Sequence, residues 1–249
     1  KFPTFSIEGR SAIIVQGGMG AGVSLPPLSG EVARLGGVGV VSTIALDRIV
    51  PGQLGNHFEA TEIAIKEAKR LSGGNGMIGA NFMALMHTYE DSVRGAVAGG
   101  ADCLFVGAGL PTDLPGLVTN PEIALVPIVS SDRALTIVCK QWKKRFNGRT
   151  PDAVVLEGPL AGGHLGFKAD DIKKPEFQIE EIFGPVLQVS KEYGGFPVIV
   201  AGGIWDQKDI LRWIDAGASG VQMGTRFLAT HESGASDAFK QAVVEVISD

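Results

Sequence analysis

The chain has 249 residues, of which 45% are hydrophobic and 20% charged, and its formal net charge is −5. This composition supplies a full hydrophobic core and argues against disorder. The acidic balance, with no basic run longer than Lys143–Arg145, argues against nucleic-acid binding. The chain also lacks an apolar run near the ~18 residues of a membrane span, and Cys103 and Cys139 lack the spacing of a metal site. We therefore expect a cytoplasmic protein with buried free thiols.

Strand and helix signals alternate along the whole chain. Apolar runs bounded by Gly and Pro predict strands at Ala12–Gln16, Val38–Ser42, Met77–Phe82, Cys103–Val106, Ala124–Val129, Ala153–Leu156, Pro197–Ala201 and Gly220–Gly224. Helical patterns lie between or after them, at Leu28–Leu35, Thr61–Leu71, Tyr89–Ala98, Leu114–Val118, Arg133–Phe146, Ile179–Tyr193, Asp206–Ala216 and Ala235–Ser248. Asp206 is a plausible N-cap. The irregular piece Leu160–Gln178 is either a flap over the barrel mouth or a solvated loop.

Eight strand-helix units in this length favour an α/β fold, a single (β/α)8 TIM barrel spanning residues 1–249. A doubly wound sheet is the alternative. The glycines that follow the first strand, Gly17–Gly22, do not have the G-x-G-x-x-G spacing of a dinucleotide-binding turn. The barrel is therefore the simpler interpretation, and it places functional residues at the carboxyl ends of the strands.

The loop after the sixth predicted strand is the strongest candidate for chemistry. It begins at Glu157 and contains His164, with Gly163 and Gly166 on either side. An imidazole in this position can donate or accept a proton near neutral pH. Glu157 either orients the loop or the substrate, or is a capping or salt-bridged carboxylate. The other histidines, His57 and His87 in predicted loops and His231 after the last strand, are better explained as incidental surface or packing residues.

The last two strands end in Gly202-Gly203 and in Gly224-Thr225. The corresponding loops commonly bind phosphate in this fold, so these residues predict a phosphate site. Asn81 ends the third strand, where its amide suits either a flavin pyrimidine edge or a cap to a neighbouring loop. Gln16 is open to the same two interpretations, and Met19 packs either on a ring or into the core.

Six segments, in order, resemble the nitronate monooxygenases, formerly called 2-nitropropane dioxygenases, and their relatives the flavin-dependent enoyl-ACP reductases. They are Gln16-Gly-Gly-Met-Gly, Gly79-Ala-Asn-Phe-Met, Val106-Gly-Ala-Gly-Leu-Pro, Glu157-Gly-Pro-Leu-Ala-Gly-Gly-His-Leu-Gly, Val200-Ala-Gly-Gly-Ile and Val221-Gln-Met-Gly-Thr-Arg-Phe. The Gly-Gly-His loop followed by the last two segments is the most specific part. Family members often run longer, so the resemblance also implies that a C-terminal extension is missing.

The resemblance implies FMN at the barrel mouth and no metal. His164 would be the catalytic acid/base or oxyanion partner. The implied cofactor-binding residues are Gln16, Gly17, Gly18, Met19, Asn81, Glu157, Gly163, Gly202, Gly203, Gly224 and Thr225. The implied reaction is oxidation of an alkyl nitronate with O2 to a carbonyl compound and nitrite.

Three alternatives stay open at this point. The same loops serve NAD(P)H-dependent enoyl-ACP reduction with FMN. The chain could instead be a non-enzymatic protein that binds flavin or phosphate. It could also be a flavin-free phosphate-sugar isomerase that uses Glu157 with His164. The partner would be a small-molecule substrate with O2 or NAD(P)H, without nucleic acid or membrane, and a homodimer is compatible with the sequence.

Overall fold

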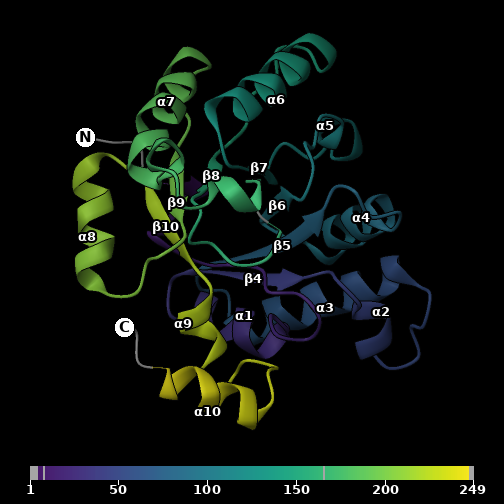
Figure 1. Ribbon diagram of the computed structural model, residues 1–249. Coiled ribbons are helices and arrows are strands. Elements are labelled where there is room, and N and C mark those ends of the chain that lie inside the picture. The colour runs from purple at the N-terminus through teal and green to yellow at the C-terminus, as the bar shows by residue number, and fades with distance from the viewer. Residues whose placement is uncertain (1–4, 8, 165, 247–249) are drawn as a thin grey trace.

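Eight parallel strands close into a barrel in the computed structural model, in the order β10-β3-β4-β5-β6-β7-β8-β9 (Figure 1). The structure describes residues 5–7, 9–164 and 166–246. The predicted (β/α)8 class is confirmed. The barrel strands are β3 (Ile14–Gln16), β4 (Val38–Ser42), β5 (Met77–Met83), β6 (Cys103–Gly107), β7 (Ala124–Val129), β8 (Val154–Glu157), β9 (Val198–Ala201) and β10 (Gly220–Met223).

The helices surround the strands in Figure 1. They are α1 (Pro26–Arg34), α2 (Leu46–Ile49), α3 (His57–Ser72), α4 (Tyr89–Gly99), α5 (Leu114–Leu117), α6 (Asp132–Arg145), α7 (Ile179–Glu192), α8 (Gln207–Ala216), α9 (Thr225–Leu228) and α10 (Asp237–Glu245). None of the helices within the described residues is long and apolar enough to cross a membrane.

The N-terminal residues depart from the prediction. Two short strands, β1 (Ser6–Ile7) and β2 (Arg10–Ser11), form a hairpin that is too short to give a periodic signal. Ala12 donates its N–H to the carbonyl of Phe5 at 3.1 Å, so the first barrel strand begins at Ile14 rather than at Ala12.

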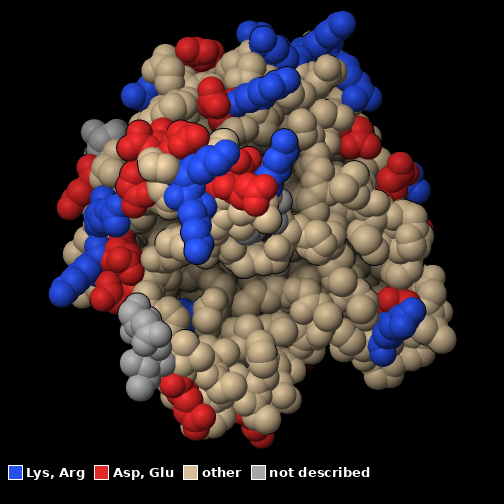
Figure 2. Space-filling view, viewed as in Figure 1, with Lys and Arg blue, Asp and Glu red and all other residues tan. Residues whose placement is uncertain are grey.

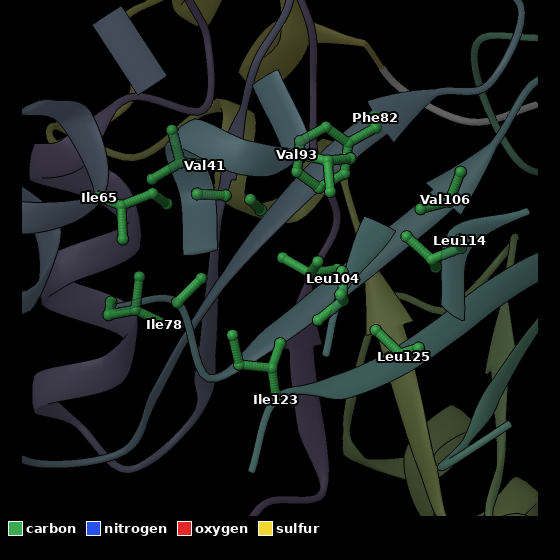
Figure 3. Packing of buried hydrophobic residues seen from close by; sticks show 14 of the residues in the cluster. Val41, Ile65, Ile78, Phe82, Val93, Leu104, Val106, Leu114, Ile123 and Leu125 are labelled. Carbon is green, nitrogen blue, oxygen red and sulfur yellow. The ribbon is translucent and has the colours of Figure 1, made fainter. Parts of the chain in front are cut away.

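The barrel has one core inside and two outside. Phe5 and Ile7 of the hairpin belong to the inner cluster together with Val40, Phe105 and other inward side chains of the strands. The outer face of β4 to β7 packs against the neighbouring helices, as Figure 3 shows for the side chains Val41, Ile65, Ile78, Phe82, Val93, Leu104, Val106, Leu114, Ile123 and Leu125. The outer face of β8 to β10 packs in a separate cluster. Because successive strand residues alternate between these cores, the clusters identify which side chains point inward.

Most helix boundaries agree with the prediction, and the exceptions have local causes. The third helix begins at His57 instead of Thr61, because the Asn56 side chain accepts a hydrogen bond from the N–H of Glu59 at 3.1 Å and caps it there. The placement of His57 in a loop was therefore wrong. Asp206 caps α8 with a full capping box, as expected. The last helix ends at Glu245, and the part of its predicted range after residue 246 lies outside the described residues.

The segment predicted to be irregular, Leu160–Gln178, contains two 3-10 turns. They are η1 (Ala169–Asp171) and η2 (Pro175–Phe177). Phe167 meets Phe177 edge-to-face, with ring centroids 5.9 Å apart. Both cysteines are buried and free, as predicted, and burial raises the pKa of each thiol.

Candidate functional site at the barrel mouth

The carboxyl ends of the strands bring the predicted residues to one rim. Asn81 and Glu157 point into the barrel, because their strand neighbours Phe82 and Leu156 belong to the outer clusters. Register pairs place Met223 beside Gln16 and Glu157 beside Ala201. In Figure 2 the centre of the face seen in Figure 1 is mostly uncharged, and charged side chains gather toward its upper edge.

Gln16 is the last residue of the short strand β3, and its side chain links this strand to β4 and to the loop that follows. Its Oε1 accepts the N–H of Val40 at 2.9 Å, and its Nε2 donates to Ser24 Oγ at 2.8 Å and to the carbonyl of Gly17. The side chain is completely buried. Gln16 thus holds β4 and the glycine loop in register, and its known hydrogen bonds are all with protein groups.

Gly18 lies directly against Asn81. A Cβ added to Gly18 would come within 2.3 Å of Asn81 Cβ, so only glycine fits here. Asn81 is half-buried, its Nδ2 donates to the carbonyl of Phe105 at 3.4 Å, and its backbone carbonyl accepts from the hydroxyl of Thr43 at 2.9 Å. The long side-chain contact leaves the Asn81 amide with most of its hydrogen-bonding capacity unused.

Glu157 is the acidic group at the mouth. Burial raises the pKa of its carboxyl to about 7. Within the described part of the chain the carboxylate makes no hydrogen bond or ion pair, so the salt-bridged interpretation finds no support. A carboxyl with this pKa exists in both protonation states near neutral pH, which is the property of a group that holds or transfers a proton.

The His164 loop rises from β8 and rests on the end of β9. Added Cβ atoms at Gly202 and Gly203 would lie 2.7 Å from the nitrogen of Ala161 and 2.8 Å from Leu160 Cδ1. Both glycines have positive φ, +104° and +70°. These glycines are therefore required by the backbone and by the loop above them.

His164 itself is exposed. The preceding Gly163 has a φ of +90°, and a Cβ added there would meet no atom within 4 Å. Within the described residues the imidazole makes no hydrogen bond, which leaves both ring nitrogens available to a ligand.

The ends of β10 and β3 are adjacent, and β10 is also the neighbour of β9 in the barrel. A Cβ added to Gly224 would lie 3.7 Å from Met19 Sδ, an ordinary contact distance. Thr225 begins the short helix α9 and is exposed. Met19 is half-buried beside these residues, so the predicted phosphate segment and the predicted ring-packing residue are neighbours.

Two inward polar residues were not singled out by the sequence. Gln222 is half-buried and its side chain lies 3.4 Å from the position of a Cβ on Gly17. Ser42 ends β4 in register with Asn81. The sequence does mark both residues, because each is a polar residue at an inward position near the end of a strand. The described residues contain no group of three His, Cys, Asp or Glu side chains that could hold a metal.

Comparison with known proteins agrees with this geometry. The family model described as nitronate monooxygenase matches residues 56–249, most of the chain. The chain belongs to the nitronate monooxygenase family. A probable nitronate monooxygenase of Staphylococcus aureus is 40% identical over 95 residues, 37% of this chain and 25% of that protein. The chain thus spans about a quarter of the length of the curated relatives that it matches.

Solved structures match over nearly the whole chain. FabK from Thermotoga maritima superposes with a TM-score of 0.74 at 26% identity, over 97% of this chain and 66% of that one. Nitroalkane oxidase from Streptomyces ansochromogenes gives a TM-score of 0.71 at 22% identity, over 97% of this chain and 70% of that one. The second likeness shows a shared fold alone.

Proposed function

We propose that the chain is an FMN-dependent oxidoreductase that oxidises alkyl nitronates with O2 to a carbonyl compound and nitrite. The observation that carries this proposal is the convergence of the Gly17–Gly22 loop, Asn81, the His164 loop and Gly224 on one barrel end. Membership of the nitronate monooxygenase family supports it. Residues 1–249 would form one FMN-binding domain.

The residues at the mouth fit a flavin. A flavin has a flat ring with one polar edge and an anionic phosphate tail. Gly18 and Met19 would line the ring, and Gln16 and Gly17 would support it by holding the glycine loop in place, with Asn81 and Glu157 at its polar edge. Gly202, Gly203, Gly224 and Thr225 would hold the phosphate through backbone N–H groups and a hydroxyl, with Gly163 near the ring. When bound, FMN would supply the electron transfer between substrate and O2.

His164 and Glu157 would supply the protein's part of the chemistry. The exposed imidazole can hydrogen-bond the nitro oxygens and stabilise their negative charge, or remove the α-proton of a neutral nitroalkane. The Glu157 carboxyl, with a pKa of about 7, can remain neutral near an anionic substrate instead of repelling it. The two groups would therefore have complementary roles. His164 would act as the base or as the hydrogen-bond partner of the anion, and Glu157 would be a buried carboxyl that keeps its proton.

Enoyl-ACP reduction with NAD(P)H is the second candidate, because the six segments quoted above are shared with those reductases. Both reactions would use the same ring-binding and phosphate-binding residues. The identity of the electron donor separates them.

The test is anaerobic mixing of the FMN-loaded chain with an alkyl nitronate and, separately, with NADH and NADPH. Loss of flavin absorbance with the nitronate alone is the expected result. Rapid loss with a nicotinamide alone would favour enoyl reduction, and a chain that takes up no FMN would refute both.

A further inference from the structure

The hydroxyl of Ser42 is a buried polar group without a partner. Ser42 is 3% exposed, and its Oγ makes no hydrogen bond with any residue that the structure describes. Among the described residues it shares this condition with only two other side-chain atoms, Gln53 Oε1 and the hydroxyl of Tyr89. Buried polar groups are nearly always hydrogen-bonded, so an unpaired one calls for an explanation.

Ser42 lies at the mouth and points inward. Val40 belongs to the core inside the barrel and Val41 to the core outside it, so the next residue, Ser42, turns toward the interior. Its register partner on β5 is Asn81. Tyr89 packs edge-to-face on the outward Phe82, with ring centroids 6.2 Å apart, so its hydroxyl belongs to the outer layer.

The backbone N–H of Ser42 and the nearby serine hydroxyls have hydrogen-bond partners in the protein. The backbone N–H of Ser42 donates to the carbonyl of Ser24 at 3.0 Å. The hydroxyl of Ser24 contacts both Gln16 and Gly17, and the hydroxyl of the buried Ser29 donates to the carbonyl of Leu25 at 3.0 Å. The unpaired Ser42 hydroxyl therefore contrasts with the neighbouring hydroxyls of Ser24 and Ser29, which both have partners in the protein.

We propose that Ser42 is a flavin-binding residue whose hydroxyl donates a hydrogen bond to the polar edge of the isoalloxazine ring, beside Asn81. This inference rests on the proposed function. It explains why the oxygen is unpaired in the protein alone, because its acceptor arrives with the ligand. Because water does not reach this hydroxyl in the protein alone, the hydrogen bond costs little desolvation, and it forms when the groups that cover the oxygen move aside as the ring binds.

The test is Ser42→Ala, with dissociation constants for FMN and for riboflavin measured by flavin fluorescence. Loss of one hydrogen bond should weaken binding about 3- to 10-fold. The factor should be the same for both ligands, because the contact is with the ring and riboflavin lacks the phosphate. Without flavin, the thermal midpoint of Ser42→Ala should stay unchanged or rise by about 2–4 °C, since an unpaired buried hydroxyl is removed.

Ser29→Ala is the matched control. It removes a buried hydroxyl that has a partner, so its thermal midpoint should fall while flavin affinity is kept. Ser42→Cys, which replaces the hydroxyl with a weaker donor, should bind flavin with intermediate affinity and provides a second variant if alanine does not fold.

Equal affinity of wild type, Ser42→Ala and Ser42→Cys would overturn the inference and leave the proposed function standing. A lower thermal midpoint of flavin-free Ser42→Ala with unchanged affinity would also overturn it, because that result marks a structural role. Failure of the wild type to bind either flavin would refute the proposed function together with the inference.

Discussion

Replacing Glu157 with Gln tests the electrostatics of the mouth in the protein without ligand. Burial raises the pKa of this carboxyl from 4.5 to about 7. Between these two pH values the unfolded chain carries the charge while the folded chain keeps the proton. The folded protein therefore binds more protons, and the stability contributed by the neutral acid is lost as pH rises through about 7.

The rise in the pKa of Glu157 sets the size of the expected difference in stability. A difference of about 2.5 pKa units corresponds to about 3 kcal/mol once both states are ionised. The amide of Gln cannot ionise and avoids this cost. Glu157→Gln should therefore exceed the wild type in free energy of unfolding by about 1 kcal/mol at pH 5 and by about 3 kcal/mol at pH 8.5.

Urea unfolding of both proteins at the two pH values measures the difference directly. Glu122→Gln, which changes an exposed residue, is the control and should alter stability little at either pH. If the difference between Glu157→Gln and wild type is the same at pH 5 and pH 8.5, Glu157 does not change protonation in this range and its carboxyl is not the buried neutral acid described here.

Three further predictions concern single residues of the mouth. His164→Ala should keep flavin absorbance and lose turnover in a nitronate assay, because the imidazole is exposed and makes no hydrogen bond within the described residues; full turnover would remove it from catalysis. Gly18→Ala should lower the free energy of unfolding by about 1–3 kcal/mol in urea, because its Cβ would overlap Asn81, and an unchanged value would show that this contact is loose. Gly224→Val should fold normally, because a Cβ at this position makes only an ordinary contact with Met19. In fluorescence titration it should lower the affinity for FMN more than the affinity for riboflavin; equal losses of affinity would place the phosphate elsewhere.

The fold could be predicted from the sequence because its strands are buried on both faces. Runs such as Ala124–Val129 are apolar throughout, and their boundaries agree with the structure. The two-residue strands of the N-terminal hairpin were missed, since their role depends on Phe5 reaching the barrel interior rather than on a local pattern. The start of α3 was missed for a similar reason, because it depends on the side chain of Asn56.

The site residues that the sequence predicts are those that a glycine or a strand end marks. Gly18 belongs to a glycine-rich loop that is visible in the sequence. The structure explains the need for glycine there, because any larger side chain would overlap Asn81. The sequence could not show that Gly202 and Gly203 lie beneath Leu160–Ala161, because that contact joins two loops far apart in the chain. It also could not show that Glu157 makes no ion pair within the described residues, because that depends on every element around the mouth.

The measurement to make first is an FMN titration of the purified chain. We expect saturable binding of one FMN per chain, with a change in the visible flavin spectrum, and weaker binding to Gly224→Val. A folded chain that leaves the spectrum and fluorescence of added FMN unchanged would contradict this expectation.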